Sequence, residues 1–261
     1  MIKDGSSSNR PRVVAKKSLG QNFLMHARIA ERIALTAPIT RESVVLEIGP
    51  GTGMLTRELL KKAKKVIAVE ADDELFEKLR IDFAETIGKG RLELHHGDVR
   101  TFDADSLPKG YLLVANIPYY ITGEIFRMFL EAKNQPSTMV LLVQKEVAER
   151  IARSKKESLL SLSVKAYGTP SYAFTVPRGA FHPAPKVDSA VIKVEDISRK
   201  NFSSQEEEDR FFKLIHAGFA HKRKFVRKNL TEAGLRAGDL PEKARAEDLP
   251  LATWLDLARM Q

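Results

Sequence analysis

Short apolar runs rich in β-branched residues alternate with amphipathic segments through the first half of the chain. The runs are VVLEIG (44–49), KVIAVEA (65–71), RLELHHGD (91–98), YLLVANIP (111–118) and TMVLLVQ (138–144), separated by segments such as GMLTRELLKKA. This alternation predicts an α/β fold in which helices cover both faces of a mostly parallel sheet. The later runs LLSLSVKAYG (159–168), SYAFTV (171–176) and SAVIKVE (189–195) lack clear helical segments between them. They are therefore expected to be strands that end the sheet in an antiparallel hairpin.

The character of the chain changes at both ends. Residues 1–15 are rich in Ser, Pro and Arg, which predicts a flexible basic N-terminal arm. Near Ser198 the polar stretch SRKNFSSQEEED offers Ser203 or Ser204 as a helix N-cap before a run of acids, and the pattern beyond it is helical. We expect an α/β domain over 16–198 and a small all-α domain over 199–261.

Composition excludes several kinds of chemistry. The chain has 261 residues, a net charge of +9 and no cysteine, so disulfides, zinc thiolate sites and cysteine nucleophiles are ruled out. No stretch approaches the roughly 20 apolar residues that span a bilayer, and the N-terminus lacks the apolar core of a secretory signal. We expect a soluble, cytoplasmic protein.

The positive charge is concentrated in two places. Residues 1–30 carry five of the nine net charges, and the segment HKRKFVRK (221–228) contains no acid. One such cluster is as often solvated surface as a binding site, but two on one chain favour a polyanionic partner such as nucleic acid. The candidate contacts are Lys16, Lys17, Lys222, Arg223, Lys224, Arg227 and Lys228.

A glycine-rich turn follows the first apolar run. Gly49, Gly51 and Gly53 would let the backbone approach a ligand at the carboxyl edge of a parallel sheet, and Glu70 ends the second run, where a carboxylate can accept both hydroxyls of a ribose. A dinucleotide fingerprint starting at Gly49 would need a small residue where Met54 stands. The pattern Glu47-x-Gly-x-Gly-x-Gly instead resembles S-adenosylmethionine-dependent methyltransferases. In those enzymes an acid at the position of Asp98 binds the cofactor's adenine; a loop-capping carboxylate is the alternative.

The stretch NIPYY (116–120) ends the fourth run with an amide, a proline and two phenols. It resembles the motif of amino-methyltransferases that act on adenine or cytosine. The Asn116 side-chain oxygen and the Ile117 carbonyl could accept the two N–H groups of an exocyclic amine, and Pro118 would fix the turn. Tyr119 could stack on the target base. An Asx-capped turn with core-packing tyrosines is the alternative.

Other catalytic arrangements are not indicated. No triad or metal cage is recognisable near these motifs. The adjacent His95 and His96 lie on one predicted strand, so their side chains should point to opposite faces and could not chelate a metal together. We expect no metal.

Seven segments in order resemble the ribosomal RNA adenine dimethyltransferases that act on the small subunit. They are KKSLGQNFL (16–24), EIGPGTGMLT, VEAD, GD, NIPYYIT, QKEVAERI and FHPAPKVDSAV (181–191). The resemblance implies a Rossmann-like class I methyltransferase and the transfer of two methyl groups to N6 of each of two adjacent adenines. The substrate would be a 3′-terminal hairpin loop of small-subunit rRNA, bound by a monomeric enzyme during ribosome biogenesis.

The same resemblance assigns site residues. The S-adenosylmethionine contacts fall on Asn22, Leu24, Gly49, Gly51, Glu70, Asp98 and Asn116. The base pocket falls on Asn116, Ile117, Pro118 and Tyr119, with Phe181 as a second stacking face.

Two departures and three alternatives accompany this resemblance. The stretch SKKESLLSLSV replaces a glycine- and tyrosine-containing family segment, and HKRKFVRKNL keeps the family's bases but not all of its polar residues. The alternatives are a binding protein that has lost methyl transfer, a DNA adenine methyltransferase that flips its base, and a relative that methylates large-subunit rRNA.

Overall fold

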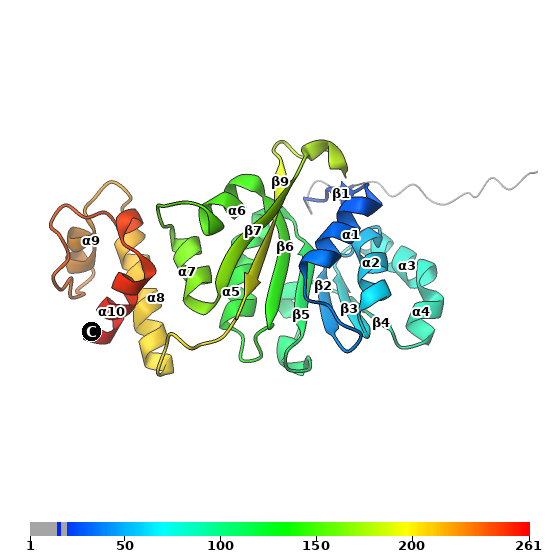
Figure 1. The fold of residues 1–261 in the computed structure, drawn as a ribbon, viewed down its shortest axis with the longest axis horizontal. Helices are drawn as coiled ribbons and strands as arrows, with labels where there is room; N and C mark the ends of the chain where they lie inside the picture. The colour runs from blue at the N-terminus through cyan, green and yellow to red at the C-terminus, as the bar shows by residue number, and fades with distance from the viewer. Residues whose placement is uncertain (1–14, 17–19) are drawn as a thin grey trace, which may run out of the picture.

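A seven-stranded sheet forms the centre of the protein (Figure 1). The computed structural model describes residues 15, 16 and 20–261, so Lys17 and nearly all of the predicted arm lie outside the described residues. The strand order is β4-β3-β2-β5-β6-β9-β7. The strands are β2 (Val44–Ile48), β3 (Lys65–Glu70), β4 (Leu92–His96), β5 (Leu112–Asn116), β6 (Thr138–Gln144), β7 (Thr169–Val176) and β9 (Ser189–Glu195).

Strand direction agrees with the sequence-based prediction. Strands β2 to β6 pair in parallel, whereas β9 pairs antiparallel with both β6 and β7. The predicted mostly parallel sheet with an antiparallel end is therefore confirmed.

Helices cover both faces of the sheet because its central strands are apolar on both sides. In β5, Leu112 and Val114 belong to one hydrophobic cluster and Leu113 and Ala115 to the other. The helices in this part of the chain are α1 (Ala27–Thr36), α2 (Met54–Lys62), α3 (Asp73–Asp82), α4 (Ala84–Gly88), α5 (Thr122–Glu131), α6 (Lys145–Ala152) and α7 (Leu159–Tyr167). Helices α1 and α2 pack on the first cluster, and α5, α6 and α7 on the second.

The prediction of a strand at 159–168 is wrong, because this segment forms helix α7. Ser158 and Ser161 make a capping box, in which the Ser158 hydroxyl accepts from the Ser161 N–H at 3.1 Å and Ser161 Oγ accepts from the Ser158 N–H at 2.6 Å. Ser163 Oγ donates to the Leu159 carbonyl at 2.8 Å. The alternating Leu and Ser residues resemble a half-buried strand, but the serines satisfy their hydroxyls within the helix.

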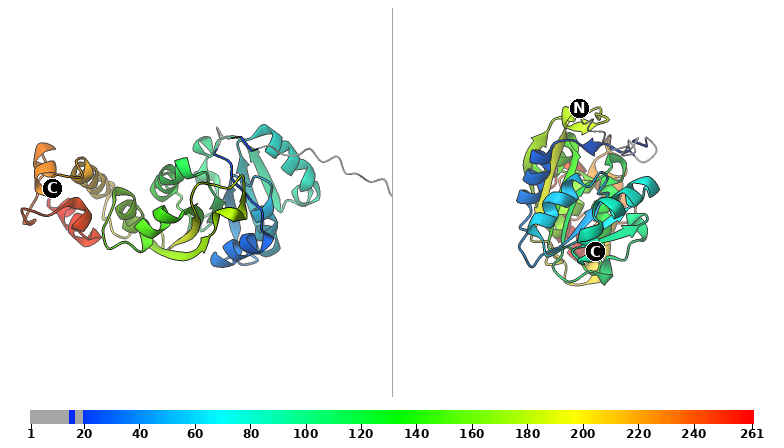
Figure 2. Two further views of the ribbon diagram at one scale, coloured as in Figure 1. Left: turned by 90° about the horizontal axis from the view of Figure 1, so that it is seen from above. Right: turned by 90° about the vertical axis from the view of Figure 1, so that its right-hand side faces the viewer.

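A helical region follows the sheet and lies at the end of the molecule farthest from α3 and α4 (Figures 1 and 2). It consists of α8 (Gln205–Phe219), α9 (Val226–Glu232) and α10 (Leu251–Met260), with Ser204 as the N-cap of α8. The Ser204 side chain accepts from the Glu207 N–H at 3.3 Å. Phe211 and Trp254 are fully buried in the same hydrophobic cluster as α5 and α7, so this region shares a core with the sheet.

A small second sheet was not predicted from the sequence. Strand β1 (Phe23–Leu24) pairs antiparallel with β8 (Phe181–His182), and the Met25 N–H donates to the Ala180 carbonyl at 2.9 Å. This pairing ties the segment before α1 to the connection between β7 and β9. Within the described residues, no helix is both long and apolar enough to cross a membrane.

Candidate active site

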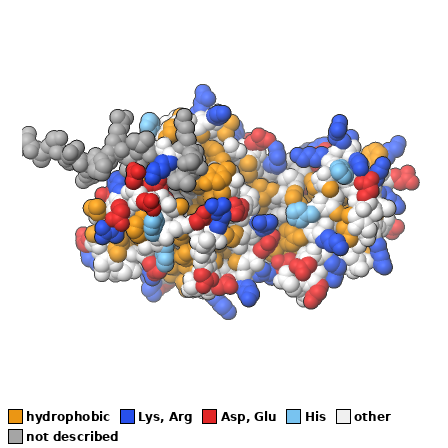
Figure 3. Space-filling view, turned by 180° about the vertical axis from the view of Figure 1, so that it is seen from behind, with side chains coloured by type: hydrophobic (Ala, Val, Ile, Leu, Met, Phe, Trp, Pro, Cys, Tyr) orange, Lys and Arg blue, Asp and Glu red, His pale blue; other side chains and the backbone are white. Residues whose placement is uncertain are grey.

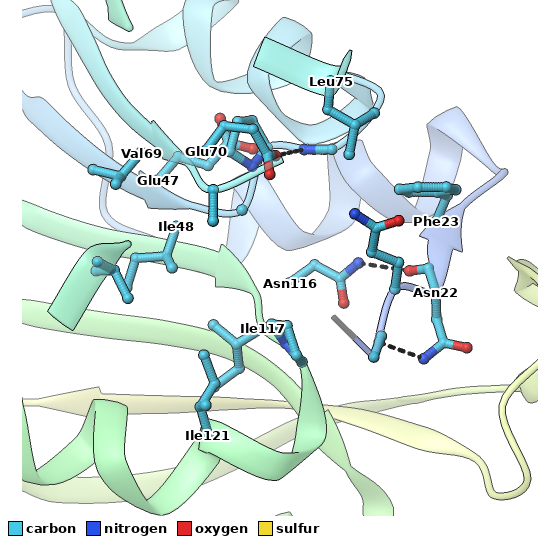
Figure 4. A pocket seen from close by; sticks show the side chains of 18 of the residues that line it. Asn22, Phe23, Glu47, Ile48, Val69, Glu70, Leu75, Asn116, Ile117 and Ile121 are labelled. Carbon is cyan, nitrogen blue, oxygen red and sulfur yellow. Dashed lines mark hydrogen bonds between the residues drawn. The ribbon is translucent and has the colours of Figure 1, made fainter. Parts of the chain in front are cut away.

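A cavity opens where β2, β3, β4 and β5 end, and the segment before α1 lies across it (Figure 4). It is lined by residues at or just after the carboxyl ends of these four strands and by residues 20–24. The predicted site residues that line it are Asn22, Leu24, Gly49, Gly51, Glu70, Asp98, Asn116, Ile117, Pro118 and Tyr119. Residues far apart in the sequence thus meet at the carboxyl edge of the sheet, the usual ligand position in α/β folds.

The glycine turn between β2 and α2 requires residues without side chains. Gly53 has a φ of +76°, and a Cβ there would lie 2.6 Å from Phe83 Cε2. Gly51 has a φ of +59°, and a Cβ there would lie 3.3 Å from Phe23 Cδ1. The turn therefore combines left-handed backbone geometry with close packing, and the N–H groups of Gly49 and Gly53 donate to the carbonyls of Val69 and Pro50 at 2.9 Å.

Glu70 is buried at the end of β3 and supports this turn. One carboxylate oxygen accepts from the Gly51 N–H at 2.9 Å and the other from the Asp72 N–H at 3.0 Å. Burial raises the pKa of Glu70, while these backbone hydrogen bonds oppose the rise. Each oxygen keeps a further lone pair for a ligand hydroxyl.

Lys16 pairs with acids of its own chain, although it was predicted to bind RNA. Its Nζ lies 2.9 Å from Asp72 Oδ2 and 3.3 Å from Glu74 Oε1. Gln21 Nε2 donates to the same Asp72 oxygen at 3.1 Å. Burial acts to raise the pKa of Asp72, but the hydrogen bonds from Lys16, Leu75 N and Gln21 together lower it. Lys16 and Gln21 therefore both bind Asp72, the N-cap residue of α3.

Asp98 lies in the turn after β4 and is held by Arg100. Arg100 Nε donates to both carboxylate oxygens at 2.9 Å, and the Arg100 N–H donates to Oδ1 at 2.9 Å. The hydrogen bond from the Arg100 side chain is the main reason that the pKa of Asp98 is lowered. Asp98 thus caps its loop, as the alternative interpretation expected, while its carboxylate also lines the cavity.

Asn116 joins the end of β5 to the segment that crosses the cavity. Its Nδ2 donates to the Asn22 carbonyl at 3.3 Å, and Asn22 Nδ2 donates to the Gly20 carbonyl at 3.1 Å (Figure 4). With the amide nitrogen engaged there, no hydrogen bond among the described residues uses Asn116 Oδ1. Pro118 follows with φ −57° and ψ 135°, which keeps the chain extended before a short turn.

The two predicted stacking faces lie in different places. Tyr119 lines the cavity, and its hydroxyl is 2.6 Å from Ser189 Oγ of β9. Phe181 is only 4% exposed, pairs with Leu24 in the small sheet and packs in a hydrophobic cluster. It does not belong to the cavity lining, so the structure does not bring it to the Tyr119 side of the site.

Glu47 was recognised only as part of the glycine motif, yet it is an unusual site residue. It is 1% exposed, and neither its Oε2 nor the nearby Thr56 Oγ1 has a hydrogen-bond partner among the described residues. Burial raises the pKa of Glu47 to about 8. A carboxyl group in a strand that is otherwise apolar was the sequence signal for this residue.

The basic segment 221–228 lies in the helical region, and none of its residues lines the cavity. Lys and Arg side chains are frequent on the surface at the helical end of the molecule, on the right of Figure 3. Lys224 Nζ is 3.0 Å from Glu232 Oε2, and Arg227 Nη1 donates to the Leu240 carbonyl at 2.7 Å. Lys222, Arg223 and Lys228 are exposed and make no ion pair with a described residue. Three of the five predicted bases therefore remain unengaged by the described part of the chain.

The histidines and acids of the described residues form no group of three that could hold a metal ion. His95 Nε2 lies 2.6 Å from Glu93 Oε1, whereas His96 Nε2 lies 2.8 Å from Asp73 Oδ1 of α3. The two rings thus have separate partners.

The sheet order, the glycine turn and the acid that supports it define a class I methyltransferase. The family model for ribosomal RNA adenine dimethylase matches residues 13–260. The chain belongs to the ribosomal RNA adenine dimethylase family.

Its relatives are similar over nearly their full lengths. Ribosomal RNA small subunit methyltransferase A of Dehalococcoides mccartyi is 40% identical, over 93% of this chain and 87% of the relative. The protein of the same name from Fusobacterium nucleatum is 37% identical, over 94% and 97%. Among solved structures, the 23S rRNA methyltransferase ErmE has a TM-score of 0.74 and 28% identity, over 91% and 98%. A dimethyladenosine transferase from Plasmodium falciparum has a TM-score of 0.75 and 26% identity, over 90% and 95%.

Proposed function

We propose that this enzyme uses S-adenosylmethionine to dimethylate N6 of two adjacent adenines in a 3′-terminal hairpin loop of small-subunit rRNA. The observation that carries the proposal is the position of Asn116, whose amide nitrogen is engaged by Asn22 while its oxygen remains available at the cavity. The names of the curated relatives support the small subunit as substrate. We further propose that the enzyme acts as a monomer in the cytoplasm, on an immature small subunit.

The cavity residues fit the proposed cofactor. Glu70 keeps lone pairs for the ribose hydroxyls. Because Gly49 and Gly51 have no side chains, the cofactor could approach the backbone of this turn closely. Asp98 can accept from an adenine amino group beside its pair with Arg100, and Asn22 and Leu24 would close the cofactor side. S-adenosylmethionine supplies an electrophilic methyl group on its sulfonium.

The target base would be bound by the residues after β5. The amine of adenine is a poor nucleophile because its lone pair is delocalised into the ring. Asn116 Oδ1 and the Ile117 carbonyl would accept its two N–H groups and direct the lone pair toward the methyl group. Tyr119, held by Ser189, would stack on the ring. No strong base is needed, since the methylated amine loses its proton to water.

We assign RNA binding to the helical region 199–261 and catalysis to 16–198. Lys222, Arg223 and Lys228 are the bases best placed to contact phosphates, because Lys224 and Arg227 already have partners. Such contacts give affinity that falls as salt rises.

The similarity to ErmE makes large-subunit rRNA the second candidate substrate. The test incubates the protein and labelled S-adenosylmethionine with undermethylated small subunits, large subunits or duplex DNA, and maps the labelled base. We expect label on two adjacent adenines of the small subunit. Label on the large subunit or on DNA would show that the proposed substrate is wrong. No label on any of the three would favour a binding protein without methyltransferase activity.

A substitution at Asn116 tests its proposed role in catalysis. Asn116→Ala should abolish turnover while the cofactor Kd stays within a few-fold of wild type. Asn201→Ala, which removes an amide bonded to the Ala166 carbonyl and outside the cavity lining, is the matched control. Turnover by Asn116→Ala at the wild-type rate would refute the proposed role.

A further inference from the structure

Two consecutive tyrosines at the cavity have different surroundings. Tyr119 is partly buried, and its hydroxyl is fixed by Ser189 at 2.6 Å. Tyr120 also lines the cavity but is 64% exposed, and no hydrogen bond to a described residue holds its hydroxyl. Of these two rings, Tyr119 therefore lies inside the cavity and Tyr120 at its mouth.

The Tyr120 ring is positioned despite its exposure. Its Cδ1 and Cε1 atoms lie 3.1 Å from the point that a Cβ on Gly20 would occupy, so the ring packs closely against the backbone of residue 20. Residues 20–24 are tied to β5 through the bond from Asn116 Nδ2 to the Asn22 carbonyl, and to the N-cap residue of α3 through the bond from Gln21 Nε2 to Asp72 at 3.1 Å. The ring therefore rests on a fixed support while most of its surface faces solvent.

We propose that Tyr120 is the stacking platform for the nucleotide next to the target adenine. This inference rests on the proposed function, in which the substrate has two adjacent adenines. When one base occupies the cavity beside Tyr119, the neighbouring nucleotide of the RNA must lie at the mouth. Tyr120 is the exposed aromatic residue of the cavity lining and is therefore placed to contact that base. An aromatic face accepts any base, and its two side-chain torsions lose little freedom when it binds.

The first experiment compares Tyr120→Ala with Tyr120→Phe, which keeps the ring. On undermethylated small subunits we expect Tyr120→Ala to lower kcat/KM by about tenfold, the effect typical of losing one stacked base, while Tyr120→Phe stays within about twofold. The cofactor Kd should not change. Ile81→Ala is the control, because Ile81 is 68% exposed on α3 and outside the cavity lining.

The second experiment detects stacking directly. A hairpin RNA carries 2-aminopurine in place of the adenine next to the target, and its fluorescence is followed during titration with protein. Stacking should quench the signal with wild type, Tyr120→Phe and Ile81→Ala but not with Tyr120→Ala. If Tyr120→Ala quenched the fluorescence as strongly as wild type, or methylated small subunits at the wild-type rate, the proposed stacking role of Tyr120 would be refuted. Failure of wild type to methylate small subunits would instead refute the proposed function.

Discussion

Glu47→Gln should make the protein more stable, and increasingly so as the pH rises. Glu47 is buried without a partner for Oε2, and burial raises its pKa from the usual value of 4.5 to about 8. The folded state therefore holds a proton that the unfolded state releases. For an acid whose pKa is raised, stability is lost as the pH rises from the unfolded value through the folded one.

The size of the effect follows from the two pKa values. One pKa unit corresponds to about 1.4 kcal/mol, so keeping Glu47 buried costs about 2 kcal/mol near pH 6 and about 5 kcal/mol near pH 9. Glutamine has nearly the same shape but no charge to bury. We expect the free energy of unfolding of Glu47→Gln to exceed that of wild type by about 3 kcal/mol more at pH 9 than at pH 6.

Urea unfolding at both pH values measures this difference, provided that the m-value is unchanged. Glu85→Gln is the control: Glu85 is exposed, and its hydrogen bond with Lys89 lowers its pKa. Glu85 is ionised in both states across this range, so its removal should give no pH-dependent difference. Parallel stability curves for wild type and Glu47→Gln would refute the argument from burial.

Three other variants test packing, the link between the sheet and the helical region, and RNA binding. Gly218→Ala should destabilise the protein by about 2 kcal/mol in urea unfolding, because a Cβ there would lie 2.2 Å from Trp254 Cη2; unchanged stability would mean that the ring moves freely. Arg199→Met leaves Glu208, whose side chain is 5% exposed, without its charge partner at 2.9 Å. It should cost about 2–3 kcal/mol. Adding Glu208→Leu should recover only part of the loss, because the Glu131 and Ala132 carbonyls and the Tyr167 hydroxyl then still lack their partners. Replacing Lys222, Arg223 and Lys228 with Gln should reduce the slope of log K against log salt by about 2 to 3, whereas Lys64→Gln should not change it.

The predictions from local pattern were the most successful. The five apolar runs form parallel strands, and the polar residues after them meet at one edge because parallel strands present their carboxyl ends together. Periodicity and the chemistry of single residue types were sufficient here. Gly53 was expected to let the backbone approach a ligand, but it is not part of the cavity lining, and the structure explains it by its close packing against Phe83.

Pattern failed where two local structures were equally compatible with the residues. Alternating Leu and Ser at 159–164 fits a half-buried strand, and only the reciprocal hydrogen bonds of Ser158 and Ser161 select the helix. Phe181 stands in a motif with polar neighbours, yet its pairing with Leu24 buries it. The spacing of apolar and polar residues within these two segments does not reveal either contact.

Charge was the least informative signal, because a base is equally suited to a phosphate or to a carboxylate of its own chain. Lys16 lies in a basic cluster, but the chain brings Asp72 and Glu74 to it. Asn116 meets the Asn22 carbonyl across a separation of 94 residues. Residues 20–24, which lie across the cavity, are thus held by β5, by Asp72 at the start of α3 through Gln21, and by the small sheet. Since these contacts also position Gly20 against the Tyr120 ring, the inner part of the cavity and its mouth depend on the same few long-range hydrogen bonds.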